Sequence, residues 1–148
     1  MKEEGCQYLF VYGTLRRELV DRLAPAPIAG IIQGLNFVGR GSIRGELYDL
    51  GSYPAAICGE DFATLVKGEV YRLQDPEATL MLLDVYEGCV PGEPEASLFL
   101  RRSESVTMEE GGVLPCWLYV YNDWVQGSSP IAGGDYVSYL ESRNATVE

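Results

Sequence analysis

Two short segments, far apart in the sequence, carry the residue types that proton-transfer chemistry requires. Residues 8–16, YLFVYGTLR, predict a buried strand that ends in a glycine turn, and backbone N–H groups at such a turn can hold an anion. Residues 82–88, LLDVYEG, predict the end of a helix that presents one carboxylate, Glu87. An anion-holding turn and a single acid/base group can run proton transfer without a metal or a cofactor.

Glu87 needs a raised pKa to act as a base near neutral pH, since an unperturbed glutamate has a pKa of about 4.3. Burial would raise its pKa, and the negative end of the predicted helix would act in the same direction. The competing interpretation is that Glu87 is an ordinary helix-surface carboxylate, as Glu77 is expected to be. The residue types around position 87 do not by themselves decide between the two.

The composition removes several kinds of catalytic machinery. The chain contains no histidine, which excludes Ser-His-Asp and Cys-His nucleophiles and the commonest transition-metal ligand. Its four cysteines lack the spacing of a metal site and lie in or beside apolar stretches, so we expect reduced core residues rather than disulfides. Acid/base work therefore falls to other side chains, and we expect neither a metal nor a cofactor.

Length and charge predict a single domain over residues 1–148 with small-molecule rather than polymer partners. The formal net charge is −11, from 22 acidic and 11 basic residues, which disfavours nucleic acid and anionic membranes. No stretch reaches the roughly 20 apolar residues that span a bilayer, and the first residues lack the pattern of a secretory signal. We therefore expect a cytoplasmic protein that has no contact with membranes. The oligomeric state is left open.

Hydrophobic periodicity and turn residues predict seven short strands and three helices, which is typical of an α+β fold. The expected strands are residues 7–12, 31–38, 42–50, 55–58, 64–73, 98–108 and 115–122, and the expected helices are 15–23, 76–87 and 134–142. Asp75 as N-cap, Pro76 at the first helical position and Gly88 after the last turn define the middle helix. Glycines in and between the strands, including a turn or bulge at 39–41, favour a curved sheet that closes into a barrel.

The order of five motifs along the chain is informative. After YGTL at 12–15 come GELYDLGSYPAAI at 45–57, GEVY at 68–71, LDVYE at 83–87 and WLYVY at 117–121. In this order they resemble the γ-glutamylcyclotransferase-like family, and GGDY at 133–136 fits as well. The resemblance implies a small, mostly antiparallel mixed β-barrel flanked by short helices. It also implies cofactor-independent release of 5-oxoproline from a γ-glutamyl group, whose α-amine attacks its own γ-carbonyl.

The resemblance also assigns residues. Glu87 matches the catalytic glutamate of the family. The expected substrate-binding residues are Tyr12, Gly13, Thr14, Leu15, Tyr53, Pro54 and Tyr121. For Tyr53 and Pro54, a role in supporting the barrel rim is an equal alternative. For Tyr121 and its same-face neighbour Tyr119, core packing is at least as good an alternative as a hydrogen bond to substrate or Glu87.

Three charged residues and one departure from the family pattern complete the candidates. Arg16 and Arg17 follow the glycine turn, where they could steer an anionic substrate or simply lie solvated at the surface. Asp84, one turn before Glu87, is expected to bind backbone or an arginine. Residues 99–101, FLR, stand where relatives carry Tyr-x-Arg, so Phe99 lacks a hydroxyl group.

The sequence thus predicts an enzyme that releases 5-oxoproline from a γ-glutamyl amine or γ-glutamyl amino acid by intramolecular aminolysis, with Glu87 as general acid/base. Within this class, the sequence does not specify the leaving amine. A tagged biosynthetic intermediate and a γ-glutamyl-lysine isopeptide both remain open as the γ-glutamyl donor. The alternative is a binding module, in which the same barrel holds a small carboxylate or a partner without turnover, and the missing hydroxyl at Phe99 gives it weight.

Overall fold

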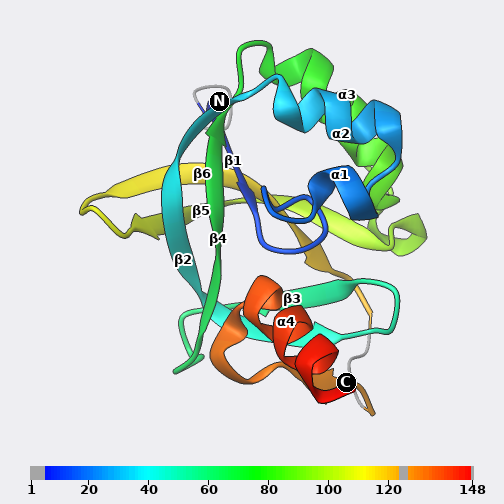
Figure 1. Ribbon diagram of the computed structural model, residues 1–148. Helices are drawn as coiled ribbons and strands as arrows, with labels where there is room; N and C mark the ends of the chain where they lie inside the picture. The colour runs from blue at the N-terminus through cyan, green and yellow to red at the C-terminus, as the bar shows by residue number, and fades with distance from the viewer. Residues whose placement is uncertain (1–5, 124–126, 148) are drawn as a thin grey trace.

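Five strands close into a barrel at the centre of the molecule (Figure 1). The computed structural model describes residues 6–123 and 127–147. The barrel strands are β1 (Tyr8–Val11), β2 (Asn36–Asp49), β4 (Leu65–Arg72), β5 (Phe99–Met108) and β6 (Val113–Tyr121). They follow the order β2-β4-β1-β6-β5, and a short pairing of β5 with β2 closes the ring. Only β1 and β6 run parallel, so the mixed, mostly antiparallel barrel is confirmed.

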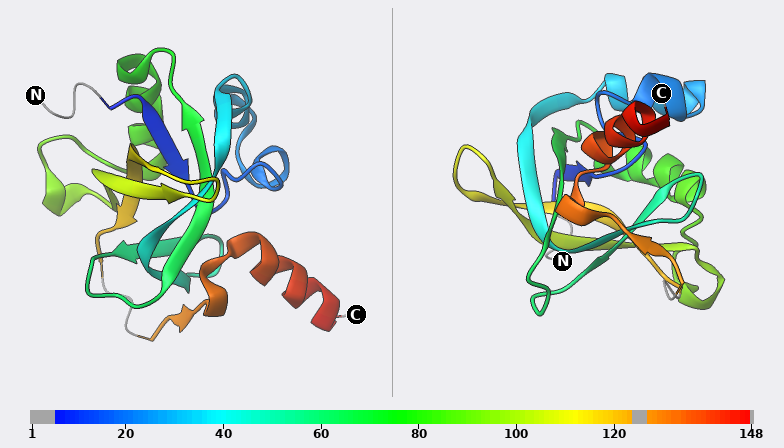
Figure 2. Two further views of the ribbon diagram at one scale, coloured as in Figure 1. Left: turned by 90° about the vertical axis from the view of Figure 1, so that its left-hand side faces the viewer. Right: turned by 60° about the horizontal axis from the view of Figure 1, so that its bottom comes forward.

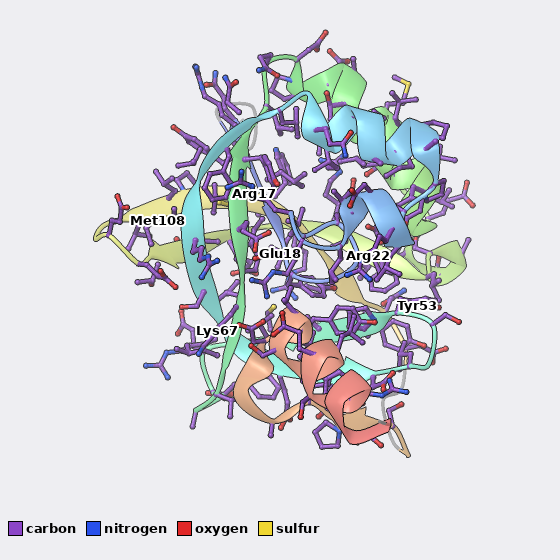
Figure 3. The ribbon with its side chains drawn as sticks, viewed as in Figure 1. Arg17, Glu18, Arg22, Tyr53, Lys67 and Met108 are labelled. Carbon is purple, nitrogen blue, oxygen red and sulfur yellow. The ribbon has the colours of Figure 1, made fainter. Side chains whose placement is uncertain are left out.

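The long strand β2 also builds a second, smaller sheet. Beyond the barrel, its last residues pair with β3 (Pro54–Cys58) and with the two-residue strand β7 (Ser129–Pro130). A bulge between Phe37 and Gly39 bends β2 near its start, as the glycines of this segment predicted. The loop between β2 and β3 carries Tyr53 (Figure 3). The bend and the length of β2 allow one strand to contribute to both sheets.

Helices α1 (Val20–Leu23), α2 (Ala26–Gln33) and α3 (Pro76–Glu87) lie together at one end of the barrel (Figure 1). Helix α4 (Tyr136–Val147) lies at the other end, after a 3₁₀ turn at Ala132–Gly134; a second 3₁₀ turn, Pro94–Ala96, precedes β5 (Figure 2). None of the helices in the described parts of the chain is both long and apolar enough to cross a bilayer. The three clustered helices therefore cover the barrel end where the loop after β1 emerges.

Local signals place α3 as predicted. The Asp75 side chain accepts a hydrogen bond from the Ala78 N–H at 3.3 Å, and Pro76 occupies the first turn. Gly88 ends the helix in the left-handed conformation with φ of 71°, in which a residue with a side chain would be strained. Buried Leu80 and Leu83 face the core, so the helix presents its last turn at a fixed place beside the barrel.

Two predicted elements near the N-terminus are wrong. Residues 15–23 form turns until Val20, and helix α1 has only four residues. Residues 31–38 are not one strand, because Ile31 belongs to α2 and β2 begins at Asn36. Pro25 and Pro27 lie at the start of α2, where a missing N–H costs nothing.

Arg16 is the clearest correction to the sequence-based expectations. Its side chain is almost fully buried, and its Nε donates to Glu69 Oε2 at 2.8 Å, while Nη1 donates to Asp135 Oδ1 at 2.7 Å. The second oxygen of Glu69 accepts from the Arg17 N–H at 2.9 Å. Arg16 therefore neither steers substrate nor lies solvated. It anchors the loop after β1 to β4 and to the segment before α4.

The Arg16–Glu69 pair generates a stability prediction. Glu69→Ala removes two hydrogen bonds and leaves a buried guanidinium short of one carboxylate, so the free energy of unfolding should fall by about 3–5 kcal/mol. Glu104→Ala is the matched control, because Glu104 pairs with Arg102 on a largely exposed strand face and should cost less than about 1 kcal/mol. Urea denaturation of the three proteins measures both values. Equal losses in the two variants would contradict a structural role for the buried pair.

Candidate active site

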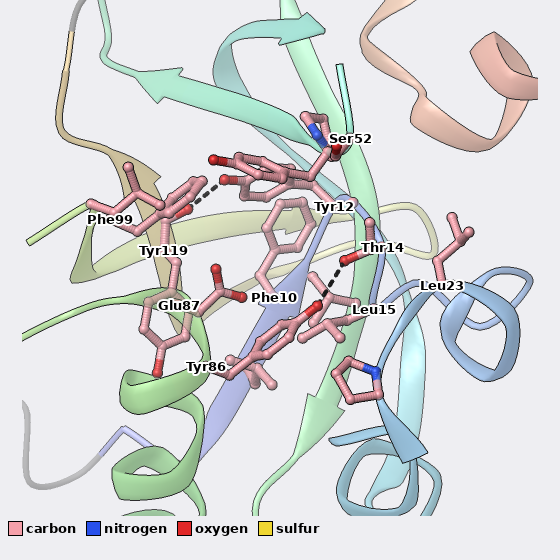
Figure 4. Close-up of a pocket in the computed structure, with 17 residues that line it drawn as sticks. Phe10, Tyr12, Thr14, Leu15, Leu23, Ser52, Tyr86, Glu87, Phe99 and Tyr119 are labelled. Atoms are coloured by element: carbon pink, nitrogen blue, oxygen red, sulfur yellow. Dashed lines mark hydrogen bonds between the residues drawn. The ribbon is translucent and has the colours of Figure 1, made fainter. Parts of the chain in front are cut away.

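A pocket of about 410 Å³ opens beside the C-terminal turn of α3 (Figure 4). Its walls come from β1 and the loop that follows it, from α1, the start of α2 and the end of α3, from the loop between β2 and β3 with the first residue of β3, and from the beginning of β5 and from β6. The lining residues are Leu9–Leu15, Leu23, Pro25, Ser52, Tyr53, Pro54, Tyr86, Glu87, Leu98, Phe99 and Tyr119. The pocket therefore brings together all the predicted site residues except Tyr121.

Glu87 supplies the carboxyl group of this pocket. It is the last residue of α3, and its half-buried side chain points into the pocket (Figure 4). Removal from water raises the pKa of Glu87 to about 7, with a further contribution from the negative charge of Asp84. Near neutral pH the group is therefore present in both protonation states. A carboxyl group in this condition can accept a proton and return it within one reaction.

Asp84 lies one turn before Glu87 and is fully engaged. Its Oδ1 accepts from the Tyr119 hydroxyl at 2.7 Å and from Arg101 Nε at 2.8 Å, and its Oδ2 accepts from Arg101 Nη2 at 3.2 Å. The guanidinium of Arg101 lies over the Trp117 ring, 4.6 Å from its centroid. The expectation that Asp84 binds an arginine is confirmed. This network ties the end of α3 to β5 and β6.

The loop from Tyr12 to Leu15 faces the pocket as a turn. The Arg16 N–H donates to the Gly13 carbonyl at 3.0 Å, and α1 begins only at Val20. The predicted donors are therefore not at a helix N-terminus, which corrects that part of the expectation. In the described part of the chain, no protein group accepts a hydrogen bond from the N–H of Thr14 or Leu15. Both residues line the pocket, so their N–H groups are candidates to bind an anion there.

Gly13 is required by its neighbour rather than by an unusual backbone angle. A Cβ at this position would lie 2.7 Å from Pro54 Cγ, closer than non-bonded carbon atoms approach. The contact packs the loop after β1 against the loop between β2 and β3. The Thr14 hydroxyl also lies 3.5 Å from the Tyr86 hydroxyl, which brings the loop to the end of α3 (Figure 4).

The tyrosines have different roles. The buried Tyr12 hydroxyl donates to the Tyr119 carbonyl at 2.6 Å, and burial raises the Tyr12 pKa well above its ordinary value. Tyr119 lines the pocket while its hydroxyl donates to Asp84. Tyr121 lies outside the lining and packs edge-on against Phe99, with ring centroids 5.4 Å apart. Tyr53 and Pro54 line the pocket, and Tyr53 packs on the other side of Phe99.

Sequence reasoning did not single out several lining residues. Tyr86 directly precedes Glu87, so its position in the same motif was an available signal. Leu23 and Pro25 reach the pocket because α1 and α2 fold over the barrel end, and no local pattern indicates this. Leu98 is brought to the pocket by hydrogen bonds of its own backbone: its N–H donates to the Gly88 carbonyl at 2.8 Å.

A family model described as "Gamma-glutamyl cyclotransferase, AIG2-like" matches residues 9–138. The chain belongs to this family. It is 31% identical to the gamma-glutamylcyclotransferase family protein YtfP of Escherichia coli K12 over 131 residues, which cover 87% of this chain and 95% of YtfP.

Solved structures agree with the assignment to the gamma-glutamyl cyclotransferase, AIG2-like family. A mouse AIG2-like protein has a TM-score of 0.58 at 27% identity, over 77% of this chain and 76% of the mouse chain. The solution structure of E. coli YtfP gives 0.58 at 30% identity, over 88% and 96% of the two chains. YkqA of Bacillus subtilis shares the fold, with a TM-score of 0.68 at 18% identity. The match covers 94% of this chain but only 42% of YkqA.

The raised pKa of Glu87 predicts a pH-dependent cost to the stability of this family member. Below pH 4.5 the carboxyl is protonated in both folded and unfolded states. Between pH 4.5 and 7 only the unfolded state loses the proton, so the folded state is progressively destabilised. Glu87→Gln should therefore raise the free energy of unfolding at pH 8, by at most about 3 kcal/mol, and have little effect at pH 4.

Urea denaturation of wild type and Glu87→Gln at the two pH values measures this difference. Glu77→Gln, which changes an exposed glutamate in the first turn of the same helix, is the matched control and should not reproduce the gain. A Glu87→Gln protein that is no more stable than wild type at pH 8 would show that Glu87 is not held in a desolvated environment.

Proposed function

We propose that the chain is a γ-glutamylcyclotransferase that releases 5-oxoproline from a γ-glutamyl amine or γ-glutamyl amino acid. The observation that carries the proposal is the Glu87 carboxyl group, with a pKa of about 7, in one pocket with Thr14 and Leu15, whose N–H groups have no hydrogen-bond acceptor among the described residues. The first could move protons and the second could hold a carboxylate. Membership of the family supports this assignment.

In the proposed reaction, the substrate's α-amino nitrogen forms a bond to its own γ-carbonyl carbon. The bond from that carbon to the amide nitrogen of the leaving group then breaks. Two protons leave the attacking nitrogen, and the leaving nitrogen gains two, so that an ammonium departs. Glu87 takes these two protons one after the other from the attacking nitrogen and gives each to the leaving nitrogen, a sequence that suits a carboxyl group with a pKa near the working pH.

The turn at 13–15 would bind the α-carboxylate of the γ-glutamyl unit. With that end held at Thr14 and Leu15, the substrate chain folds back and brings its amine to its γ-carbonyl carbon. Well-oriented intramolecular reactions gain on the order of 7–11 kcal/mol of barrier reduction from such positioning. Side chains and backbone of this chain carry each step, so the proposal assigns no role to a cofactor or a metal.

The first test is 5-oxoproline release, measured by mass spectrometry from a panel of γ-glutamyl amines and γ-glutamyl amino acids. Wild type should release 5-oxoproline from at least one donor, and Glu87→Gln should lower kcat/KM by about 10²–10⁴-fold, because the amide cannot shuttle a proton. The Glu77→Gln protein should retain wild-type turnover. Stabilisation by 5-oxoproline without release from any donor would point to the binding module instead.

The pH profile is a separate test of the role of Glu87. Because the unprotonated carboxylate is the base that starts the reaction, kcat/KM should rise with pH through a midpoint near 7 and level off above it. Steady-state rates from pH 5 to 9 on the best donor give the midpoint. A profile that is already flat above pH 5 would exclude Glu87, in its desolvated state, as the base.

A further inference from the structure

The wall of the pocket beside Glu87 is apolar and fixed in place. Residues 98 and 99 enter the pocket at the start of β5. The Leu98 N–H donates to the Gly88 carbonyl at 2.8 Å, and the Asn122 N–H donates to the Leu98 carbonyl at 3.1 Å. The first of these bonds holds Leu98 against the residue that follows Glu87. The side chain of Leu98 is 43% exposed, so it forms the wall of the pocket and remains accessible at its mouth.

Three aromatic rings continue this wall. The Phe99 ring lies between Tyr53, at a centroid distance of 6.0 Å, and Tyr121, at 5.4 Å. Phe99 is buried and has no polar atom on its side chain. Tyr121 braces Phe99 from outside the pocket, and Tyr53 closes the wall from the loop between β2 and β3. A group bound here would meet carbon atoms on the side of β5.

Glu87 carries the only side-chain charge among the described residues that line the pocket. Four arginines lie within two residues of a lining residue, and none of the four lines the pocket. Arg101 pairs with Asp84, and Arg16 pairs with Glu69 and Asp135. The Arg17 guanidinium lies over the Phe37 ring, and the exposed Arg22 donates to the Glu18 carbonyl at 3.5 Å. A second carboxylate on a bound substrate would find no cation in this lining. A second ammonium would find only Glu87, where it would compete with the α-ammonium that has to be deprotonated.

These contacts restrict the leaving amine. The leaving nitrogen has to come within hydrogen-bond reach of Glu87 to receive its proton, so its substituent lies against Leu98 and Phe99. A charged group carried into this apolar wall would lose its hydration without gaining a partner. We propose that the leaving amine carries an uncharged, apolar alkyl or aryl substituent, with Leu98 and Phe99 forming the subsite of that substituent. This inference rests on the proposed cyclotransferase function.

Three γ-glutamyl donors that differ only at the end of a three-carbon chain test the inference. They are the γ-glutamyl derivatives of propylamine, of 1,3-diaminopropane and of 4-aminobutanoate, which end in a methyl, an ammonium and a carboxylate. Wild type should have a kcat/KM for the propylamine donor about ten- to a hundredfold above either charged donor. Release of 5-oxoproline with equal or better rates on a charged donor would overturn the apolar subsite and leave the proposed function standing.

A variant pair locates the subsite. Leu98→Arg places a cation on the pocket wall at a position exposed enough to accept it, and it should shift the ratio of kcat/KM toward the carboxylate donor by about tenfold. Leu82→Arg is the matched control, because Leu82 is 53% exposed on α3 and does not line the pocket, so its ratio should equal that of wild type. The same ratio in both variants would overturn the assignment of Leu98.

Binding to Glu87→Gln protein keeps the inference testable if no donor is turned over. Wild-type protein that releases 5-oxoproline from none of the three donors would count against the proposed function. The thermal stabilisation of Glu87→Gln by each donor would still report on the subsite. Greater stabilisation by the propylamine donor supports the apolar wall, and equal or greater stabilisation by a charged donor overturns it.

Discussion

Burial of the Glu87 carboxyl group is the constraint on which the site depends. A glutamate in water is too weak a base at neutral pH, and a fully paired one would be weaker still. The fold resolves this by ending α3 beside the barrel, so that the final residue is desolvated but faces a pocket. The Asp75 cap and the Gly88 terminus therefore have a functional consequence, because they fix which residue of the helix reaches the pocket.

The arginines around the site are placed so that they do not lower the raised pKa of Glu87. Arg101 lies on the strand that lines the pocket, yet its guanidinium binds Asp84 with two hydrogen bonds and lies over Trp117. Arg16 follows the turn at 13–15, yet its guanidinium pairs with Glu69 and Asp135. A free cation beside Glu87 would stabilise the carboxylate and lower its pKa. Each ion pair thus supports the site mechanically and removes a charge that would lower the pKa of Glu87.

Signals in the sequence predicted the parts of the fold that depend on neighbouring residues. Helix α3, the hairpin of β5 and β6, and the site residues Glu87 and Gly13 could be predicted because caps, turns and motifs are local. The helical spacing of apolar residues over 15–23 predicted a helix that is mostly absent, because the residues before Val20 lie in turns. The structural role of Arg16 could not be predicted, since its partners lie 53 and 119 residues away in the sequence and are brought to it only by the barrel.

The pocket divides into a backbone half and a side-chain half, and the two halves respond differently to sequence change. The turn at 13–15 would recognise the γ-glutamyl end through N–H groups, which most substitutions leave in place, provided that Gly13 still admits Pro54. The wall at Leu98 and Phe99 would recognise the leaving amine through side chains, so single substitutions there change its chemistry. In the proposed function, the reaction type and the substrate preference would therefore depend on separate residues, and the motifs that predict the reaction would carry no information about the amine.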